Sequence, residues 1–495
     1  MMKTESRWIF LIMVLALLLR MSVLPIAYRY PDRIMSNDSP TYIDPARQLA
    51  AEGYYTYPSL LRTPLYPMFL ALVLKVFGMP WANVIVIQIL ASTFNVFLTY
   101  CLARKLFSSS VAIAASLFLA VGLESIANQF FILTETLFTT LFLGSVYCFV
   151  EYKFTLRWTW LVSTAILMGL SILCRPIAIY FPVIILIFLS ILHRTNVKEL
   201  IVRGGIFLII VIAAVAPWYF RSYVLTGKPI LSTINNYNLL FYNAASLDAE
   251  LTDKSLDEQQ EIYQSQVEVL LNESKIQKTE RALDDIYSDM AKKIILEHPI
   301  RYAFVHLKYD LRNLLPGMSA ALEILAPLDN GSRDGAEILR KEGLSATLST
   351  YFGEDWINLF ILAPFIIILF IIYIAYFIGV IVLVKQRSWF ALGVLLVPIA
   401  YYLLIPGAPS NSRFRVPVMP YMSILAGVGI VSSIFWVKGK LAKQKLPLNH
   451  ETRQLAADKI MAQMAALLPE KYRGKYGALV GKEPKYLVFE TNIQQ

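Results

Sequence analysis

Long runs of apolar residues constrain this chain more than any other feature of its sequence. Most of them contain roughly 17–25 residues and few charges, the length that spans about 30 Å of hydrocarbon as an α-helix. Of the 495 residues, 57% are hydrophobic and only 16% are charged, whereas a soluble domain carries about 25% charged residues. The sequence therefore predicts an all-α polytopic membrane protein.

Hydropathy predicts about ten membrane helices and the loop charges predict their direction. Basic residues such as Arg104 and Lys105 gather in alternate short loops, and the positive-inside rule places these loops in the cytoplasm. Both termini are then cytoplasmic, and residues 28–80 and 220–356 form two long outer segments. The predicted spans are 8–27, 81–102, 110–127, 129–150, 158–173, 176–192, 202–219, 357–384, 389–405 and 416–437.

The two remaining parts of the chain are polar. The outer segment 220–356 contains "LDEQQEIYQSQVEVLLNESKIQKTERALDDIYSDMAKKIILEHPIRYAF", whose apolar residues recur at helical spacing, so it is predicted to be helical. The transmembrane domain is expected to cover 1–437. Residues 438–495 are expected to form a cytoplasmic tail, with a helix around 452–467.

The net charge of +10 does not indicate nucleic-acid binding, because the bases lie mostly in short loops between apolar runs. The three cysteines, Cys101, Cys148 and Cys174, fall within or at the ends of spans, and their spacing does not suggest a metal site. No cofactor is predicted with certainty, and a divalent metal remains open.

Five arginines depart from the charge pattern because they fall at the outer face. Guanidinium groups stay charged and bind phosphate oxygens in pairs, so arginines that converge at a membrane surface suggest a lipid phosphate. The alternative is that each arginine anchors a helix end. The five are Arg62, Arg175, Arg221, Arg413 and Arg415.

Carboxylates are expected at the same face. Asp38 and Asp44 lie in the first outer segment, and Glu135 lies near the outer end of the fourth predicted span. A carboxylate within a span is costly and indicates a functional site, although Glu135 could instead pair with one of the arginines. Glu124 and Arg20 also fall in spans, stand alone in the pattern and are predicted to be structural.

Acid and base at one face suit the transfer of a sugar from a polyprenyl phosphate. The phosphate departs without an acid, so the reaction needs a carboxylate that takes the proton of the acceptor hydroxyl and cations that stabilise the departing phosphate. Asp38 or Asp44 could be this base, and nearby tyrosines could support a sugar ring. A single displacement predicts inversion at the anomeric carbon.

Several ordered blocks resemble the polytopic GT-C glycosyltransferases, in particular the branch of protein O-mannosyltransferases and the aminoarabinose transferase ArnT. The resemblance covers about residues 8–435 and combines an acidic first-loop block, a basic Pro-Leu-Tyr-Pro block and four later blocks. In chain order they read "NDSPTYIDPARQLAAEGYY", "LRTPLYPMFLALVLKVFG", "LTETLFTTLF", "CRPIAIYFP", "PWYFRSYVLTGKPILSTINNYNLLFYN" and "SRFRVPVMPYMSILAG".

The resemblance implies a GT-C-like fold and a role for particular residues. The catalytic aspartate of the family corresponds to Asp38; the competing interpretation is that Asp38 caps a helix starting near Pro40. Ser39 stands where the family often carries a second acid, so a two-acid metal site is not implied. Residues expected to bind substrate are Tyr42, Asp44, Arg62, Tyr66, Glu135, Arg175, Arg221, Arg413 and Arg415.

The sequence thus predicts an inner (plasma) membrane glycosyltransferase with an extracytoplasmic active site. Its donor is expected to be a polyprenyl-phosphate sugar, and its acceptor a lipid, glycan or protein. Two alternatives also use arginines and a lipid groove: a carrier that flips or exports lipid-linked sugars, and a glycan polymerase or ligase with a diphosphate-linked donor. Against the carrier, the chain lacks internal repeats.

Overall fold

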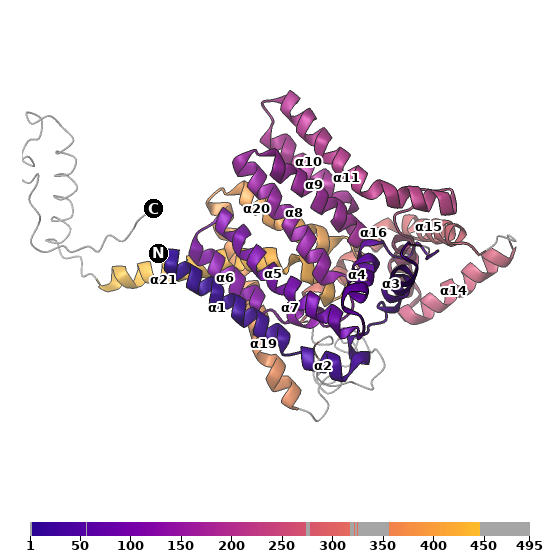
Figure 1. Cartoon of the computed structure of the whole chain (residues 1–495), viewed down its shortest axis with the longest axis horizontal. Helices are drawn as coiled ribbons and strands as arrows, with labels where there is room; N and C mark the ends of the chain where they lie inside the picture. The colour runs from indigo at the N-terminus through magenta and orange to yellow at the C-terminus, as the bar shows by residue number, and fades with distance from the viewer. Residues whose placement is uncertain are drawn as a thin grey trace, which may run out of the picture. The chain divides into compact units, whose positions relative to one another are not determined.

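The computed structural model describes residues 2–55, 57–273, 278–316, 321, 324 and 356–445. These residues form helices and no strand, which confirms the predicted all-α class (Figure 1). Met1–Ser432 is one compact unit and Ser433–Gln495 is a second. The predicted helix around 452–467 lies outside the described residues.

Each of the ten predicted spans coincides with helical structure, in some cases with two consecutive pieces. The fourth begins at Glu135 rather than at residue 129, because the backbone just before it bonds to the first outer segment. The helices are α1 (Met2–Met21), α2 (Leu24–Arg29), α5 (Ala82–Leu106), α6 (Ser109–Ala120), α7 (Leu123–Asn128), α8 (Glu135–Thr155), α9 (Trp158–Cys174), η2 (Pro176–Tyr180), α10 (Phe181–Leu192), α11 (Val197–Thr226), α19 (Trp356–Lys385), α20 (Trp389–Leu404) and α21 (Met419–Lys445).

Five helices of the described chain are long and apolar enough to cross a membrane by length and composition. Others, including α9 and α20, are apolar but shorter than 18 residues. The chain is therefore a membrane protein with several apolar helices, and the number of spans stays a prediction.

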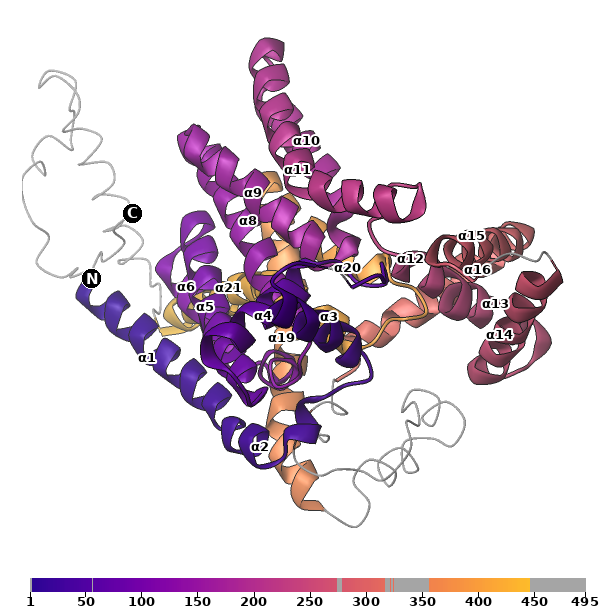
Figure 2. The ribbon, with the colours of Figure 1, turned by 45° about the vertical axis from the view of Figure 1, so that its right-hand side comes forward.

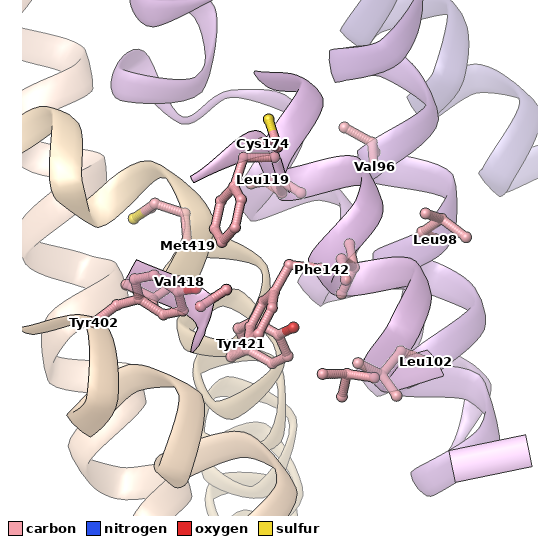
Figure 3. Packing of buried hydrophobic residues seen from close by; sticks show 14 of the residues in the cluster. Val96, Leu98, Leu102, Leu119, Phe142, Cys174, Tyr402, Val418, Met419 and Tyr421 are labelled. Carbon is pink, nitrogen blue, oxygen red and sulfur yellow. The ribbon is translucent and has the colours of Figure 1, made fainter. Parts of the chain in front are cut away.

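The core of the membrane helices is built from aromatic and aliphatic side chains (Figure 3). The ring of Phe142 from α8 lies 5.1 Å from that of Tyr402 in α20 and 6.2 Å from that of Tyr421 in α21, measured between centroids. Edge-to-face pairs of this kind stabilise a core beyond the area they bury. Packing thus joins α8, from the first half of the chain, to α20 and α21 near its end.

Small residues let α19 and α21 approach closely. A Cβ atom on Gly379 would lie 2.0 Å from the carbonyl oxygen of Leu425, and one on Gly429 would lie 1.9 Å from that of Ala375. No side chain fits at either place. Close backbone contact of this type is typical of helix pairs inside membranes.

Arg20 is structural, as predicted, although it does not stand alone. It is completely buried and donates hydrogen bonds to the hydroxyls of Ser92 (2.8 Å) and Ser125 (3.1 Å) and to the carbonyl oxygen of Ala120 (2.9 Å). Its charge therefore ties α1 to α5, α6 and α7.

The two segments predicted to be outer are also largely helical over the residues that the structure describes. The first contains an apolar helix, α4, that hydropathy does not reveal as a span because its 13 residues are too few to cross a bilayer. The helices of the second segment group together on one side of the membrane helices (Figure 2). The outer elements are η1 (Pro31–Ile34), α3 (Pro40–Glu52), α4 (Leu65–Phe77), α12 (Ile234–Asn238), η3 (Leu239–Ala244), α13 (Ala245–Thr252), α14 (Leu256–Glu273), α15 (Glu280–Glu297), α16 (Pro299–Asp310), η4 (Leu311–Leu314) and η5 (Ser412–Val418).

Candidate active site

Asp38 lies at the centre of a cluster of charged side chains from distant parts of the chain. One carboxylate oxygen is 2.7 Å from the Arg62 guanidinium, and the other is 2.6 Å from that of Arg413. Arg62 comes from the loop before α4, and Arg413 from η5. Both oxygens of one carboxylate are therefore held by separate arginines.

The helix-cap interpretation of Asp38 does not agree with the structure. Ser39, not Asp38, occupies the N-cap position of α3, and no side chain caps this helix. The Ser39 hydroxyl instead donates to the carbonyl oxygen of Ile132 (3.0 Å), and the amide of Ile132 donates to the carbonyl oxygen of Ile34 (2.9 Å). These bonds fix the Asp38 turn against the backbone that leads into Glu135.

Glu135 forms the second acidic position of the cluster. It is buried at the start of α8, and one carboxylate oxygen lies 2.7 Å from Arg175 and 3.7 Å from Arg413. Its other oxygen receives no hydrogen bond from the described residues. Arg413 thus bridges the two carboxylates.

The cluster carries an excess of positive charge. Three arginines against two carboxylates leave a formal charge of +1 (3 − 2). Burial strengthens the electrostatic interactions of these charges, because the protein screens them less than water does. The site is therefore suited to an anion.

Aromatic rings pack against the Arg62 guanidinium. The Arg62 guanidinium lies 4.8 Å from the centre of the Tyr42 ring, and Tyr42 meets Tyr66 edge to face at 5.2 Å. Tyr66 is completely buried and its hydroxyl donates to Gln88 (2.8 Å). Of the two tyrosines predicted to contact substrate, Tyr66 is thus placed behind Tyr42, in the core.

The arginines lower the pKa of Asp38. Burial alone would raise the pKa of this carboxyl, but the positive charges of Arg413 and Arg62 outweigh burial and hold the pKa below its ordinary value. Asp38 is therefore a carboxylate throughout the physiological pH range.

Removing one of these cations should change the pH dependence of any reaction in which Asp38 accepts a proton. Arg62→Met removes one of the two positive charges that lower the pKa of Asp38 against the effect of burial. The pKa of Asp38 therefore rises, and the acidic limb of kcat/KM moves to higher pH. Because the pKa of Asp38 is lowered, we expect this limb to lie below the ordinary aspartate pKa of about 3.9 in the unsubstituted protein. Profiles of kcat/KM against pH measure the shift, and Arg47→Met, an exposed arginine of α3, should leave the limb in place.

Three predicted residues lie outside this cluster. Arg221 stacks on Tyr55 and Trp218, at 5.0 and 4.6 Å from the ring centres. Asp44 is exposed on α3. Arg415 is completely buried and pairs with Glu124, because successive positions of a 3₁₀ helix point in different directions.

Arg415 and Glu124 form a buried link apart from the cluster, and substrate binding by Arg415 stays a prediction. The Arg415 guanidinium also donates to the carbonyl oxygen of Leu315 (2.9 Å) and to the Tyr373 hydroxyl (2.7 Å). Glu124 therefore does not stand alone, as its sequence position suggested. The link connects η5 with α7, α19 and Leu315, the residue that follows η4.

Asp44 opens onto a small cavity beside the cluster. The cavity has a volume of about 120 Å³, and Arg62 forms part of its wall. Asp44 therefore lies near the site, on a cavity whose lining includes Arg62 but not Asp38. The lining residues are Pro40, Thr41, Asp44, Pro45, Tyr55, Tyr57, Ser59, Leu61 and Arg62.

Sequence reasoning missed several polar residues close to the cluster. The Arg62 guanidinium donates to the Thr41 hydroxyl (2.9 Å). Burial raises the pKa of Tyr242, and the negative charge of Asp38 raises it further, which places Tyr242 near Asp38. Thr41 lies in the first quoted block and Tyr242 in the fifth, so the blocks held these residues without distinguishing them. Among the residues the structure describes, no three His, Cys, Asp or Glu side chains gather as a metal site.

Comparison with known proteins identifies a related family. Residues 61–218 match the family described as dolichyl-phosphate-mannose-protein mannosyltransferase. This family consists of glycosyltransferases, so the resemblance expected from the ordered blocks is confirmed and the enzyme class is supported. No curated protein matches the chain.

Solved structures of two glycosyltransferases resemble the chain at low identity. The oligosaccharyltransferase AglB from Archaeoglobus fulgidus, in complex with an inhibitory peptide and a dolichol-phosphate, has 13% identity and a TM-score of 0.49; the match covers 98% of this chain and 62% of AglB. ArnT from Cupriavidus metallidurans, bound to undecaprenyl phosphate, has 13% identity and a TM-score of 0.39, with coverage of 94% and 82%. The chain thus spans about 62% of the length of AglB.

Proposed function

We propose that this protein transfers a sugar from a polyprenyl-phosphate donor to an acceptor hydroxyl at the extracytoplasmic face of the membrane, with inversion. The observation that carries the proposal is the Asp38 carboxylate held by Arg62 and Arg413. It combines a candidate base with cations suited to a phosphate. The matched mannosyltransferase family supports the reaction class.

In the proposed reaction, the acceptor oxygen attacks the anomeric carbon as the bond from that carbon to the phosphate oxygen breaks. The acceptor proton passes to Asp38, and the electron pair of the broken bond leaves with the polyprenyl phosphate. Arg413 and Arg62 stabilise the phosphate charge as it develops. One displacement gives one inversion of configuration.

Donor binding also activates the base in this scheme. While both arginines hold Asp38, its lowered pKa makes it a weak proton acceptor. The donor phosphate competes for the same guanidinium groups, and an arginine that turns to the phosphate releases one carboxylate oxygen. The pKa of Asp38 then rises toward the range useful for a base.

Arg413 is expected to be needed for use of the donor. Because a hydrogen bond to a charged group contributes about 1.5–3 kcal/mol, Arg413→Ala should lower kcat/KM for the donor roughly ten- to hundredfold. Arg413→Lys should not restore it, since an ammonium cannot bind two oxygens in a fixed plane. Steady-state kinetics with varied donor measure both variants, and full activity of the lysine variant would argue for a helix anchor instead.

The orientation of the chain can be tested by labelling. Lys254 is exposed between α13 and α14, and the proposed topology puts it outside, whereas Gln444 is inside. A membrane-impermeant maleimide should label Lys254→Cys in intact cells and Gln444→Cys only after permeabilisation. Labelling of Gln444→Cys in intact cells would reverse the orientation and move the site to the cytoplasmic side.

The function itself is tested with a panel of synthetic prenyl-phosphate sugars in proteoliposomes. The proposal expects release of polyprenyl phosphate and a new glycosidic bond with one donor. A carrier would move the intact donor across the bilayer without releasing phosphate. A diphosphate-dependent polymerase or ligase would use only diphosphate-linked donors.

A further inference from the structure

Helix α16 and the η4 turn after it expose a continuous apolar stripe. Ile300 is 75% exposed, Phe304 69%, Leu307 50% and Leu311 57%. At about 100° per residue these four side chains fall within about 60° of one another around the helix axis. Leu296, in the last turn of α15, is also exposed, at 73%.

The opposite side of α16 is fixed to the end of α20. Val305, Tyr309 and Asp310 are buried there. Asp310 accepts hydrogen bonds from the Gly407 amide and the Ser410 hydroxyl, both at 2.9 Å. His306 shares a hydrogen bond with the carbonyl oxygen of Leu404, at 3.0 Å. The position of the stripe along the membrane normal is therefore fixed relative to α20.

The lengths of two helices give the depth of the stripe in the bilayer. The 16 residues of α20 extend about 24 Å, which is less than the roughly 30 Å of hydrocarbon. In α19, the Tyr373 hydroxyl donates to the carbonyl oxygen of Leu314 in η4 (2.7 Å). Tyr373 lies 12 residues (385 − 373) before the end of α19 at Lys385, or about 18 Å along the axis. Both measures place η4 and the end of α16 below the outer boundary of the hydrocarbon.

We propose that the stripe of α16 is inserted into the outer leaflet, with lipid acyl chains as its occupant. The neighbouring end of α20 agrees, because Leu404 and Ile405 are 53% and 40% exposed and continue the apolar surface. A surface helix with one apolar face binds membranes in this way. The inference needs only that α19 and α20 span the membrane, and it holds whichever reaction the protein catalyses.

On this proposal, α16 anchors the second outer segment to the bilayer. The same segment carries Asn313, whose side-chain amide donates to Ser410 (3.1 Å) two residues before η5 begins. The segment that contains the lipid-bound helix thus contacts the residues just before η5, the element that carries Arg413.

Photo-crosslinking in lipid nanodiscs tests the proposal. Phe304→p-benzoylphenylalanine and Leu307→p-benzoylphenylalanine should form adducts with phospholipid acyl chains on illumination, detected by mass spectrometry. Gln266→p-benzoylphenylalanine, at an exposed position of α14, is the matched control and should form none. Two stripe positions guard against one variant that fails to fold.

Two results would overturn it. Absence of lipid adducts at both stripe positions in folded protein would place the stripe in water. A covalent dimer at both positions, without lipid adducts, would make it an interface between copies. Sugar transfer by the unsubstituted protein is measured separately, so failure of the lipid contact and failure of the proposed reaction are distinguishable.

Discussion

Asp38→Asn should express, remain folded in detergent and bind the donor lipid, yet transfer almost no sugar. The amide keeps the size of the side chain but cannot take the acceptor proton. Loss of a general base costs on the order of 10²- to 10⁴-fold in rate, and this loss should appear in kcat. The measurement is single-turnover transfer with saturating donor, beside a binding assay with the same lipid.

Asp44→Asn is the matched control for this result. Asp44 is exposed and lies on the neighbouring cavity rather than between the two arginines, so its amide variant should retain most of the transfer rate. If Asp38→Asn kept more than about a tenth of the rate, against the 10²-fold loss expected for a base, while Asp44→Asn was inactive, the base would be Asp44. If both variants stayed active, the carrier alternative would gain support.

Arg415→Met should reduce the amount of folded protein more than any other single change at this face. The substitution leaves Glu124 buried opposite an apolar side chain. Removing one partner of a buried ion pair costs about 3–5 kcal/mol, because the other charge is left uncompensated. Thermal unfolding in detergent should show a large drop in Tm for Arg415→Met, and little change for Arg413→Ala.

Restoring neutrality tests the cause. The double variant Arg415→Met/Glu124→Gln removes both charges, so it should recover much of the stability that Arg415→Met loses. The hydrogen bonds from Arg415 to Leu315 and Tyr373 stay lost, so recovery is partial. A double variant no more stable than Arg415→Met would show that these hydrogen bonds, rather than the ion pair, stabilise the fold.

The helices could be predicted because apolar runs of membrane length dominate the sequence, and ten helical regions follow those runs. The helix α4 was missed because its 13 residues are shorter than a span and resemble a buried segment. The early start predicted for the fourth span failed for a different reason. Residues 130–133 are apolar, yet hydrogen bonds to Ile34 and Ser39 hold Ile132 outside the helix.

The candidate site was predictable in its residue types but not in its pairings. Arg413 and Arg415 stand two positions apart in the same apolar block, and nothing in that block separates them. In η5 they point in different directions, so one reaches Asp38 and the other reaches Glu124. These pairings join residues that lie 291 (415 − 124) and 375 (413 − 38) positions apart in the chain.

The hydrogen bonds of Ile132 to Ile34 and Ser39 divide the site into a fixed half and an adjustable half. They bind the Asp38 turn to the segment that precedes Glu135, so the two acids cannot separate without breaking backbone contacts. The arginines, in contrast, arrive on side chains from other loops and can change partner by rotation. We expect the acids to set where the acceptor reacts, and η5 to determine which phosphate headgroup is accepted. Exchange of η5 between related proteins should therefore alter the choice of donor while the choice of acceptor stays with the first outer segment.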